Sequence, residues 1–166
     1  MLARDRKRVA TRQAVLAVIA TIACAPALAQ EQAYDLKICS TTERSVIDQV
    51  GDTTVFSTVS RGMADSIKPG GPFDKTAYEC RAVADASKAG FSYTSRCTFV
   101  DADGHKVIGT STGNQEGWKW TFLGGTGKWE GIQGSGTGKA IGRYPRLSPA
   151  VSAMCGHSTG TFSLKK

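Results

Sequence analysis

A regular succession of short β-prone segments and turns constrains this sequence more than any other feature. From Thr53 onward, segments rich in Thr, Val, Phe, Tyr and Trp alternate with turns rich in Gly, Asp, Asn and Pro. The predicted strands cover residues 53–64, 75–86, 91–100, 106–112, 117–123, 136–144 and 157–164, and one more is expected between residues 34 and 49. No segment in this part of the chain keeps a 3.6-residue apolar period for three turns. The pattern therefore predicts an all-β fold, an antiparallel barrel or sandwich of seven or eight strands.

The hairpin over residues 75–100 has a register that the sequence itself specifies. A four-residue loop at 87–90 places Cys80 opposite Cys97. The other pairs on that face are Tyr78–Phe99, Ala82–Ser95, Ala84–Tyr93 and Ala86–Phe91. Small residues opposite large ones fill a tapering interior without clash. Directly opposed cysteines also bring their Cβ atoms to about the 4 Å that a disulfide requires. The register therefore predicts a Cys80–Cys97 disulfide.

One pair of this register is electrostatically unfavourable. Arg81 lies opposite Arg96 on the outer face, where like charges repel, and Glu79 lies diagonally beside Arg96. We expect solvation of the two arginines. The alternatives are that the two arginines bind an anion or a partner, or that the register is different.

Residues 1–29 have the features of a secretory signal. Five Lys or Arg residues begin it, an apolar stretch covers 14–25, and Ala27-Leu28-Ala29 predicts cleavage between Ala29 and Gln30. The apolar stretch is shorter than the roughly 20 residues that span a bilayer. Without the five basic residues and one Asp of this segment, 16 basic and 13 acidic residues remain, a net charge of +3. The basic residues form no stripe, so we expect no nucleic-acid partner. Residues 30–166 are expected to form one domain, periplasmic or extracellular and without a membrane partner.

The cysteines indicate two structural disulfides. Cys24 leaves with the signal, and an even number of cysteines in an exported chain is typical of a disulfide framework. If Cys80 pairs with Cys97, then Cys39 pairs with Cys155 by elimination. The second bridge would join the start of the mature chain to its last strand, at the seam where an up-and-down barrel closes. We expect the cysteines to be structural and not catalytic.

The most distinctive stretch is glycine-rich and runs from Trp118 to Gly138. Trp118, Trp120 and Phe122 alternate with polar residues, which predicts one aromatic strand face. The corner that follows contains Gly124, Gly125, Gly127 and Gly131, and glycines of this kind permit a positive φ and close backbone approach. The stretch lacks the first glycine and the final Ser or Thr of a phosphate-binding loop.

The segment GGTGKWEGIQGSG resembles the corner shared by allene oxide cyclases and dirigent proteins, and CTFVDADGHKVIG is similar to the preceding hairpin in bacterial exported barrels of this type. The resemblance implies a closed antiparallel up-and-down barrel of about eight strands, often oligomeric, with an apolar lumen. A homo-oligomer is therefore a possible partner state. Plant members cyclise a fatty-acid epoxide or direct phenoxy-radical coupling. Their catalytic residues have no counterpart that can be placed on this sequence, so the catalytic residues stay unknown.

Other residue patterns carry little support for metal binding or catalysis. The turn Asp101-Ala102-Asp103-Gly104 lacks the remaining ligands of a calcium loop and is expected to be a hairpin turn with Gly104 at positive φ. His105 and His157 have no partner at zinc-ligand spacing, and no nucleophile-elbow motif occurs. We therefore expect no metal and no cofactor. A single acidic residue inside the barrel remains an alternative, and the candidates are Glu79, Glu116 and Glu130.

Two rows of aromatic residues remain as the candidate binding site. They are Tyr78, Phe91, Tyr93, Phe99, Trp118, Trp120 and Phe122. They either fill a packed core, as in most small barrels, or line a lumen open at one end. The leading hypothesis is an exported barrel that binds a small apolar ligand, or an envelope partner, without catalysis. The alternatives are a cofactor-free isomerase or cyclase, and a structural or inhibitory module that uses loops such as residues 143–146.

Overall fold

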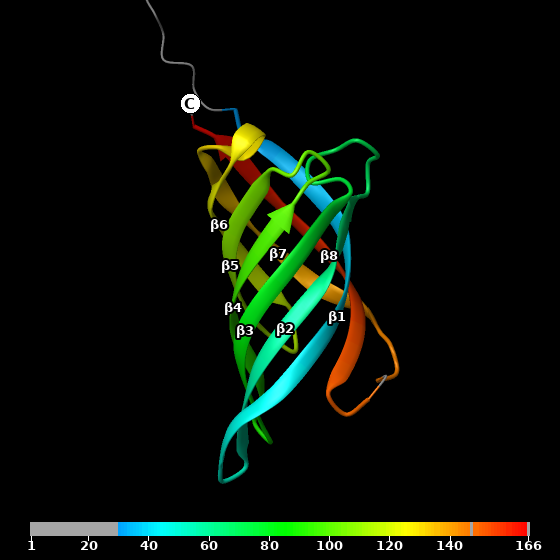
Figure 1. Ribbon diagram of the computed structural model, residues 1–166, viewed down its shortest axis with the longest axis vertical. Coiled ribbons are helices and arrows are strands. Elements are labelled where there is room, and N and C mark those ends of the chain that lie inside the picture. The colour runs from blue at the N-terminus through cyan, green and yellow to red at the C-terminus, as the bar shows by residue number, and fades with distance from the viewer. Residues whose placement is uncertain (1–29, 147, 166) are drawn as a thin grey trace, which may run out of the picture.

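The computed structural model describes residues 30–146 and 148–165, which form a closed antiparallel barrel with a simple up-and-down order (Figure 1). Strand β1 pairs with β8, so the sheet has no open edge along the seam. The strands are β1 (Gln32–Val50), β2 (Thr53–Ser66), β3 (Thr76–Ser87), β4 (Gly90–Val100), β5 (Lys106–Asn114), β6 (Trp118–Gly125), β7 (Ile132–Arg143) and β8 (Val151–Leu164). A short 3-10 helix, η1 (Gly127–Trp129), joins β6 to β7. The predicted all-β barrel is confirmed, and the sandwich is excluded.

Strand β7 begins four residues earlier than the predicted strand, so that Gly134 also belongs to it together with Gly136 and Gly138. A Cβ atom added at Gly136 would lie 2.0 Å from the Tyr34 hydroxyl oxygen, and one at Gly138 would lie 2.2 Å from the Trp118 ring. These glycines therefore leave the space in which two aromatic side chains lie against the inner wall. Strand β8 likewise begins at Val151, six residues before the predicted start.

The register of the β3–β4 hairpin is the predicted one. Cys80 lies opposite Cys97, and Tyr78 opposite Phe99. Both predicted disulfides, Cys80–Cys97 and Cys39–Cys155, are present. The unfavourable Arg81–Arg96 pair is also real. An ion pair on the outer face offsets the charge repulsion on the Arg81 side, because the Arg81 guanidinium contacts the Glu79 carboxylate at 2.8 Å.

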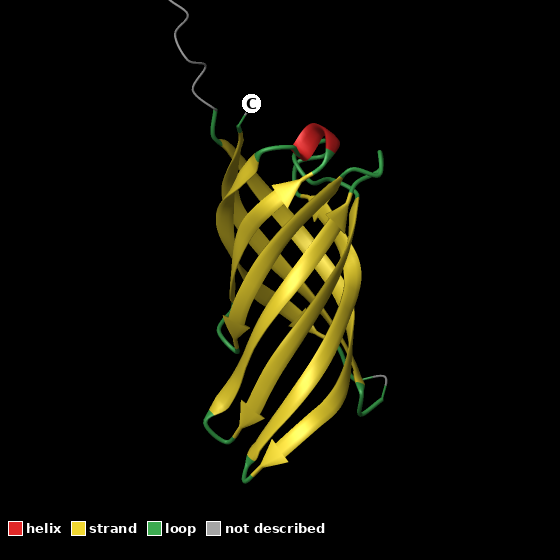
Figure 2. Ribbon diagram, turned by 60° about the vertical axis from the view of Figure 1, so that its left-hand side comes forward, coloured by secondary structure: helices red, strands yellow, loops and turns green. Residues whose placement is uncertain are grey.

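The short helix η1 lies at one end of the barrel, which we call the closed end (Figure 2). Aromatic side chains fill this end. Phe73, from the loop between β2 and β3, stacks on Trp129 with ring centroids 4.6 Å apart. Phe122 and Phe162 pack on Phe73 at 5.5 and 5.3 Å, and none of the four side chains is more than 8% exposed. Phe73 has a φ of 60°, which costs a non-glycine residue about 1–2 kcal/mol. Burial of its ring offsets that cost.

The corner between β6 and β7 lies beside this cluster. Gly127 and Gly131 adopt φ values of 58° and 71°. At Gly125 an added Cβ would lie 2.6 Å from the Trp129 carbonyl oxygen. Of the four predicted corner glycines, these three therefore have a conformational or steric reason to lack a side chain.

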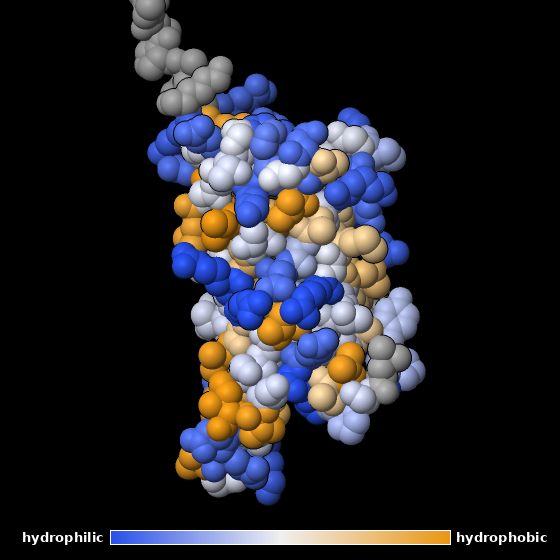
Figure 3. All heavy atoms as spheres, viewed as in Figure 1, coloured by the Kyte–Doolittle hydropathy of each residue, from blue (hydrophilic) through white to orange (hydrophobic). Residues whose placement is uncertain are grey.

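The opposite end of the barrel, which we call the open end, is uneven. Pairing of β1 with β8 stops at Glu43, whereas pairing with β2 continues to Val50. The hairpin of β1 and β2 therefore projects beyond β8, while β3 stays paired with β2 as far as Thr54. Val46, Ile47 and Val50 are exposed on it, and Figure 3 shows hydrophobic side chains gathered over this projection.

Within residues 30–146 and 148–165 no helix is long or apolar enough to cross a membrane. The predicted signal segment, residues 1–29, lies outside the described residues.

Candidate functional site

A cavity of about 370 Å³ lies inside the barrel and reaches the open end. Cavities of this size hold small organic molecules in other proteins. At its inner limit the cavity meets Phe73 and Phe122 of the closed end. At its outer limit it is lined by the turn between β5 and β6 and by the loop between β7 and β8, including Gln115, Arg143 and Arg146.

All of the predicted lumen aromatics line this cavity: Tyr78, Phe91, Tyr93, Phe99, Trp118, Trp120 and Phe122. Their exposure increases along the barrel, from 7% for Trp120 to 41% for Phe91. The deeper rings pack on each other, because Trp120 lies edge-on to both Phe99 and Phe122, at 5.1 and 5.7 Å. The packed core and the lined lumen are thus two regions of one aromatic interior.

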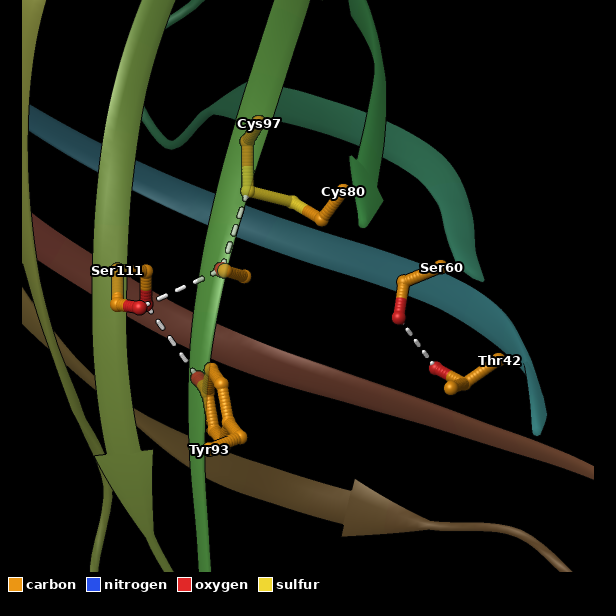
Figure 4. Close-up of a disulfide and its surroundings, with 7 residues drawn as sticks. Thr42, Ser60, Cys80, Tyr93, Cys97 and Ser111 are labelled. Atoms are coloured by element: carbon orange, nitrogen blue, oxygen red, sulfur yellow. Dashed lines mark hydrogen bonds between the residues drawn. A yellow bond between two sulfur atoms is a disulfide. The ribbon is translucent and has the colours of Figure 1, made fainter. Parts of the chain in front are cut away.

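Hydroxyl groups of Thr42, Ser60, Tyr93, Ser95 and Ser111, which we call the hydroxyl belt, line the cavity. Figure 4 shows two groups of them on either side of the Cys80–Cys97 disulfide. Thr42 and Ser60 share a hydrogen bond of 2.7 Å, and the Tyr93 hydroxyl lies 3.4 Å from that of Ser111. The Ser95 hydroxyl donates to the Ser111 carbonyl oxygen at 3.4 Å. Sequence reasoning placed Tyr93 and Ser95 on the aromatic face but did not identify Thr42, Ser60 and Ser111 as lining residues. The alternation of Leu36, Ile38, Ser40 and Thr42 along β1 would have placed Thr42 on that face.

Three tyrosines of the cavity, Tyr34, Tyr78 and Tyr93, are neutral phenols and not bases. Burial raises the pKa of Tyr78 and Tyr93, and it raises the pKa of Tyr34 to about 12. Neighbouring serine hydroxyls offset only part of this effect. All three phenols therefore stay protonated at neutral pH.

No carboxylate, imidazole or ammonium group is among the described residues that line the cavity. Glu79 lies on the outer face and accepts hydrogen bonds from Arg61 and Arg81. Glu116 and Glu130 are exposed in connecting segments at opposite ends of the barrel. None of the three candidate acids thus lies in the lumen. The lining suits binding better than proton transfer, which needs a group that titrates near neutral pH.

The two disulfides lie on opposite faces of the sheet. Cys80 and Cys97 line the cavity, and the Ser95 hydroxyl is 3.7 Å from the Cys97 sulfur. Cys39 alternates with the cavity residues Ile38 and Ser40, so its bridge to Cys155 lies on the outer wall. One bridge is therefore part of the candidate site, whereas the other closes the β1–β8 seam.

The Asp101 turn forms an ion-pair network at the closed end. The Lys128 ammonium lies 3.0 Å from the Asp101 carboxylate and 2.8 Å from that of Asp103. The Trp129 indole N–H donates to Asp101 at 2.8 Å. Asp101, Asp103 and His105 lie close enough to share a cation, but the Lys128 ammonium already pairs with both carboxylates. Gly104 has a φ of 80°, as the predicted turn requires.

Neither protein-family models nor curated protein sequences match this chain. Among solved structures, the pterocarpan synthase dirigent protein PsPTS1 is similar, with a TM-score of 0.54 at 10% identity over 82% of this chain and 97% of that one. The pterocarpan synthase dirigent protein GePTS1 gives a TM-score of 0.51 at 10% identity over 90% of this chain and 98% of that one. The chain therefore has the fold of the dirigent-like barrels. At this identity the likeness concerns the fold alone.

Proposed function

We propose that this protein binds a small hydrophobic molecule inside its barrel, without catalysing a reaction. The observation that carries the proposal is the cavity of about 370 Å³, lined by aromatic rings and open at one end. Burying a flat apolar molecule against such rings is favourable, because it removes apolar surface from water. The fold neighbours are pterocarpan synthases, which supports a role in the handling of small organic molecules.

The hydroxyl belt supports the same function, since it lets a ligand satisfy a polar atom within an otherwise apolar space. A binding cavity typically combines a hydrophobic lining with a small number of placed polar groups. Ser95 and Ser111 are each only 6% exposed, so a hydrogen bond there would be shielded from water.

Filling the cavity tests the proposal. Ala82 lines the cavity, between Thr58 and Ser95 of the neighbouring strands, whereas Val83 is 54% exposed on the outer face. We expect Ala82→Phe to reduce the affinity for phenylnaphthylamine, a neutral fluorescent aromatic probe, by at least about tenfold. Val83→Phe is the matched control and should leave the affinity within about twofold. Equal affinities for the two variants would contradict binding in the barrel.

We also propose that the chain is exported and that the mature protein begins at Gln30. The two disulfides support this, because such bridges form and persist in oxidising compartments. Expression of the full chain in a bacterium, followed by N-terminal sequencing of the protein from periplasm and medium, is expected to give Gln30 as the first residue. An intact Met1 in the cytoplasmic fraction, with free thiols, would contradict export.

A further inference from the structure

Two arginine side chains lie at the mouth of the cavity. Arg143 is the last residue of β7, and Arg146 follows in the loop to β8. Both are exposed and both contribute to the cavity lining. In the part of the chain that the structure describes, neither guanidinium has an ion-pair partner. The mouth therefore presents two positive charges that the protein itself does not neutralise.

The other charged groups around the mouth leave this positive character in place. Arg44 adds a third guanidinium, which lies over the Phe56 ring at 5.2 Å and donates to the Pro149 carbonyl oxygen at 2.8 and 3.1 Å. These hydrogen bonds tie the β7–β8 loop to β1. Asp85 and Glu116 line a shallow hollow that adjoins the cavity and shares Phe91, Asn114 and Gln115 with it, but neither carboxylate is part of the cavity lining.

The residues just inside the mouth are aromatic. Trp118, Phe91 and Tyr93 line the cavity towards the open end, and Phe91 and Tyr93 pack with centroids 5.9 Å apart. Aromatic walls favour flat rings in stacked or edge-on contact. A guanidinium is a planar donor whose geometry matches carboxylate, sulfonate and phosphate oxygens. An apolar aromatic interior thus ends in a binding group for an anion.

We propose that the cavity selects an aromatic molecule that carries an anionic group, with its rings in the lumen and its anion at Arg143 and Arg146. This inference rests on the proposed binding function and adds the chemical class of the ligand. Arg143 ends β7 and Arg146 lies in the loop that follows, both far from the closed end, so a change at the mouth need not disturb the packed end of the barrel.

Two fluorescent probes with the same ring skeleton separate the charge from the rings. Anilinonaphthalene sulfonate is an anion, and phenylnaphthylamine lacks the sulfonate. We expect the variant Arg143→Gln/Arg146→Gln to bind the sulfonate about fivefold less tightly, since each partly exposed charge pair contributes modestly. Its affinity for the neutral probe should change by less than about twofold. Added salt should weaken the binding of the sulfonate alone.

Control variants assign each outcome. Arg96→Gln removes an exposed arginine from the outer face of β4 and should change neither affinity. Ala82→Phe should weaken binding of both probes if they enter the lumen. If both probes bind in the lumen but the double arginine variant leaves their affinity ratio unchanged, the anion preference is overturned and cavity binding stands. If neither probe binds the mature protein, or Ala82→Phe has no effect, the binding function fails and the anion preference fails with it.

Discussion

The two ends of this barrel are built from the same strands, but one end is packed and the other is hollow. At the closed end, Phe73 and Trp129 enter from loops and complete an aromatic cluster that excludes water. At the open end, the loop after β7 carries arginines and the interior is hollow. The closed end therefore supplies packing free energy, whereas the open end supplies accessible surface. Binding residues are tolerated at the open end because the stability of the fold depends less on them than on the closed end.

Tryptophan truncation at each end gives the largest expected contrast. Trp129→Ala removes a ring that is 8% exposed, its stacking on Phe73, and its hydrogen bond to Asp101. We expect it to lower the free energy of unfolding by about 3–5 kcal/mol, the usual cost of truncating a buried aromatic residue. Trp118→Ala, in the half-buried part of the cavity wall, should cost about half as much. Denaturant unfolding with the disulfides intact measures both.

Ligand binding should show the reverse order for the same two variants. Trp118→Ala removes a lining ring near the mouth and should weaken phenylnaphthylamine binding, whereas Trp129→Ala should leave it nearly unchanged in the folded fraction. Two results would contradict the assignment of stability to the closed end and of binding to the open end. One is a greater loss of stability in Trp118→Ala than in Trp129→Ala, and the other is a loss of probe binding in Trp129→Ala.

Much of the fold could be predicted because independent signals in the sequence agreed. The β3–β4 register was fixed by two cysteines and by small residues opposite aromatic ones, and both signals required the same pairing. The alternation of Trp118, Trp120 and Phe122 gave one inward face correctly. Local patterns of this kind are sufficient wherever the strand alternation alone decides which side chains share a face.

What could not be predicted depends on contacts between distant segments. Phe73 follows a Pro- and Gly-rich turn, and nothing local indicates that its ring enters the barrel in a left-handed backbone conformation. The steric role of Gly136 and Gly138 in β7 could not be predicted, because the side chains that they accommodate, Tyr34 and Trp118, lie on other strands. The face of the sheet on which Cys39 lies could not be predicted, because the sequence did not define the bounds of the first strand. The sequence also did not indicate which end of the barrel is open, because this depends on relative strand lengths and loop positions.

A smaller difference between the two ends concerns how their contributions to stability depend on acidic pH. Burial alone would raise the pKa of Asp101, but hydrogen bonds from Lys128, Trp129 and two backbone N–H groups outweigh it and hold this pKa at about 2. A carboxyl group has a pKa near 4 in an unfolded chain. Because the folded pKa is the lower one, the ionised carboxylate stabilises the fold above about pH 4, and this contribution is lost as the pH falls from about 4 to 2.

The variant Asp101→Asn should therefore be less stable than the wild type at pH 7, by on the order of 1 kcal/mol once solvent screening is allowed for. The difference should disappear between about pH 4 and pH 2, as measured by denaturant unfolding at each pH. The variant Arg143→Gln/Arg146→Gln provides the comparison at the open end, where no described carboxylate pairs with either arginine. Its difference from the wild type should stay constant over the same pH range. A constant difference for Asp101→Asn would show that the network around Lys128 contributes packing but no net charge stabilisation, and the closed end would then owe its stability to its aromatic rings alone.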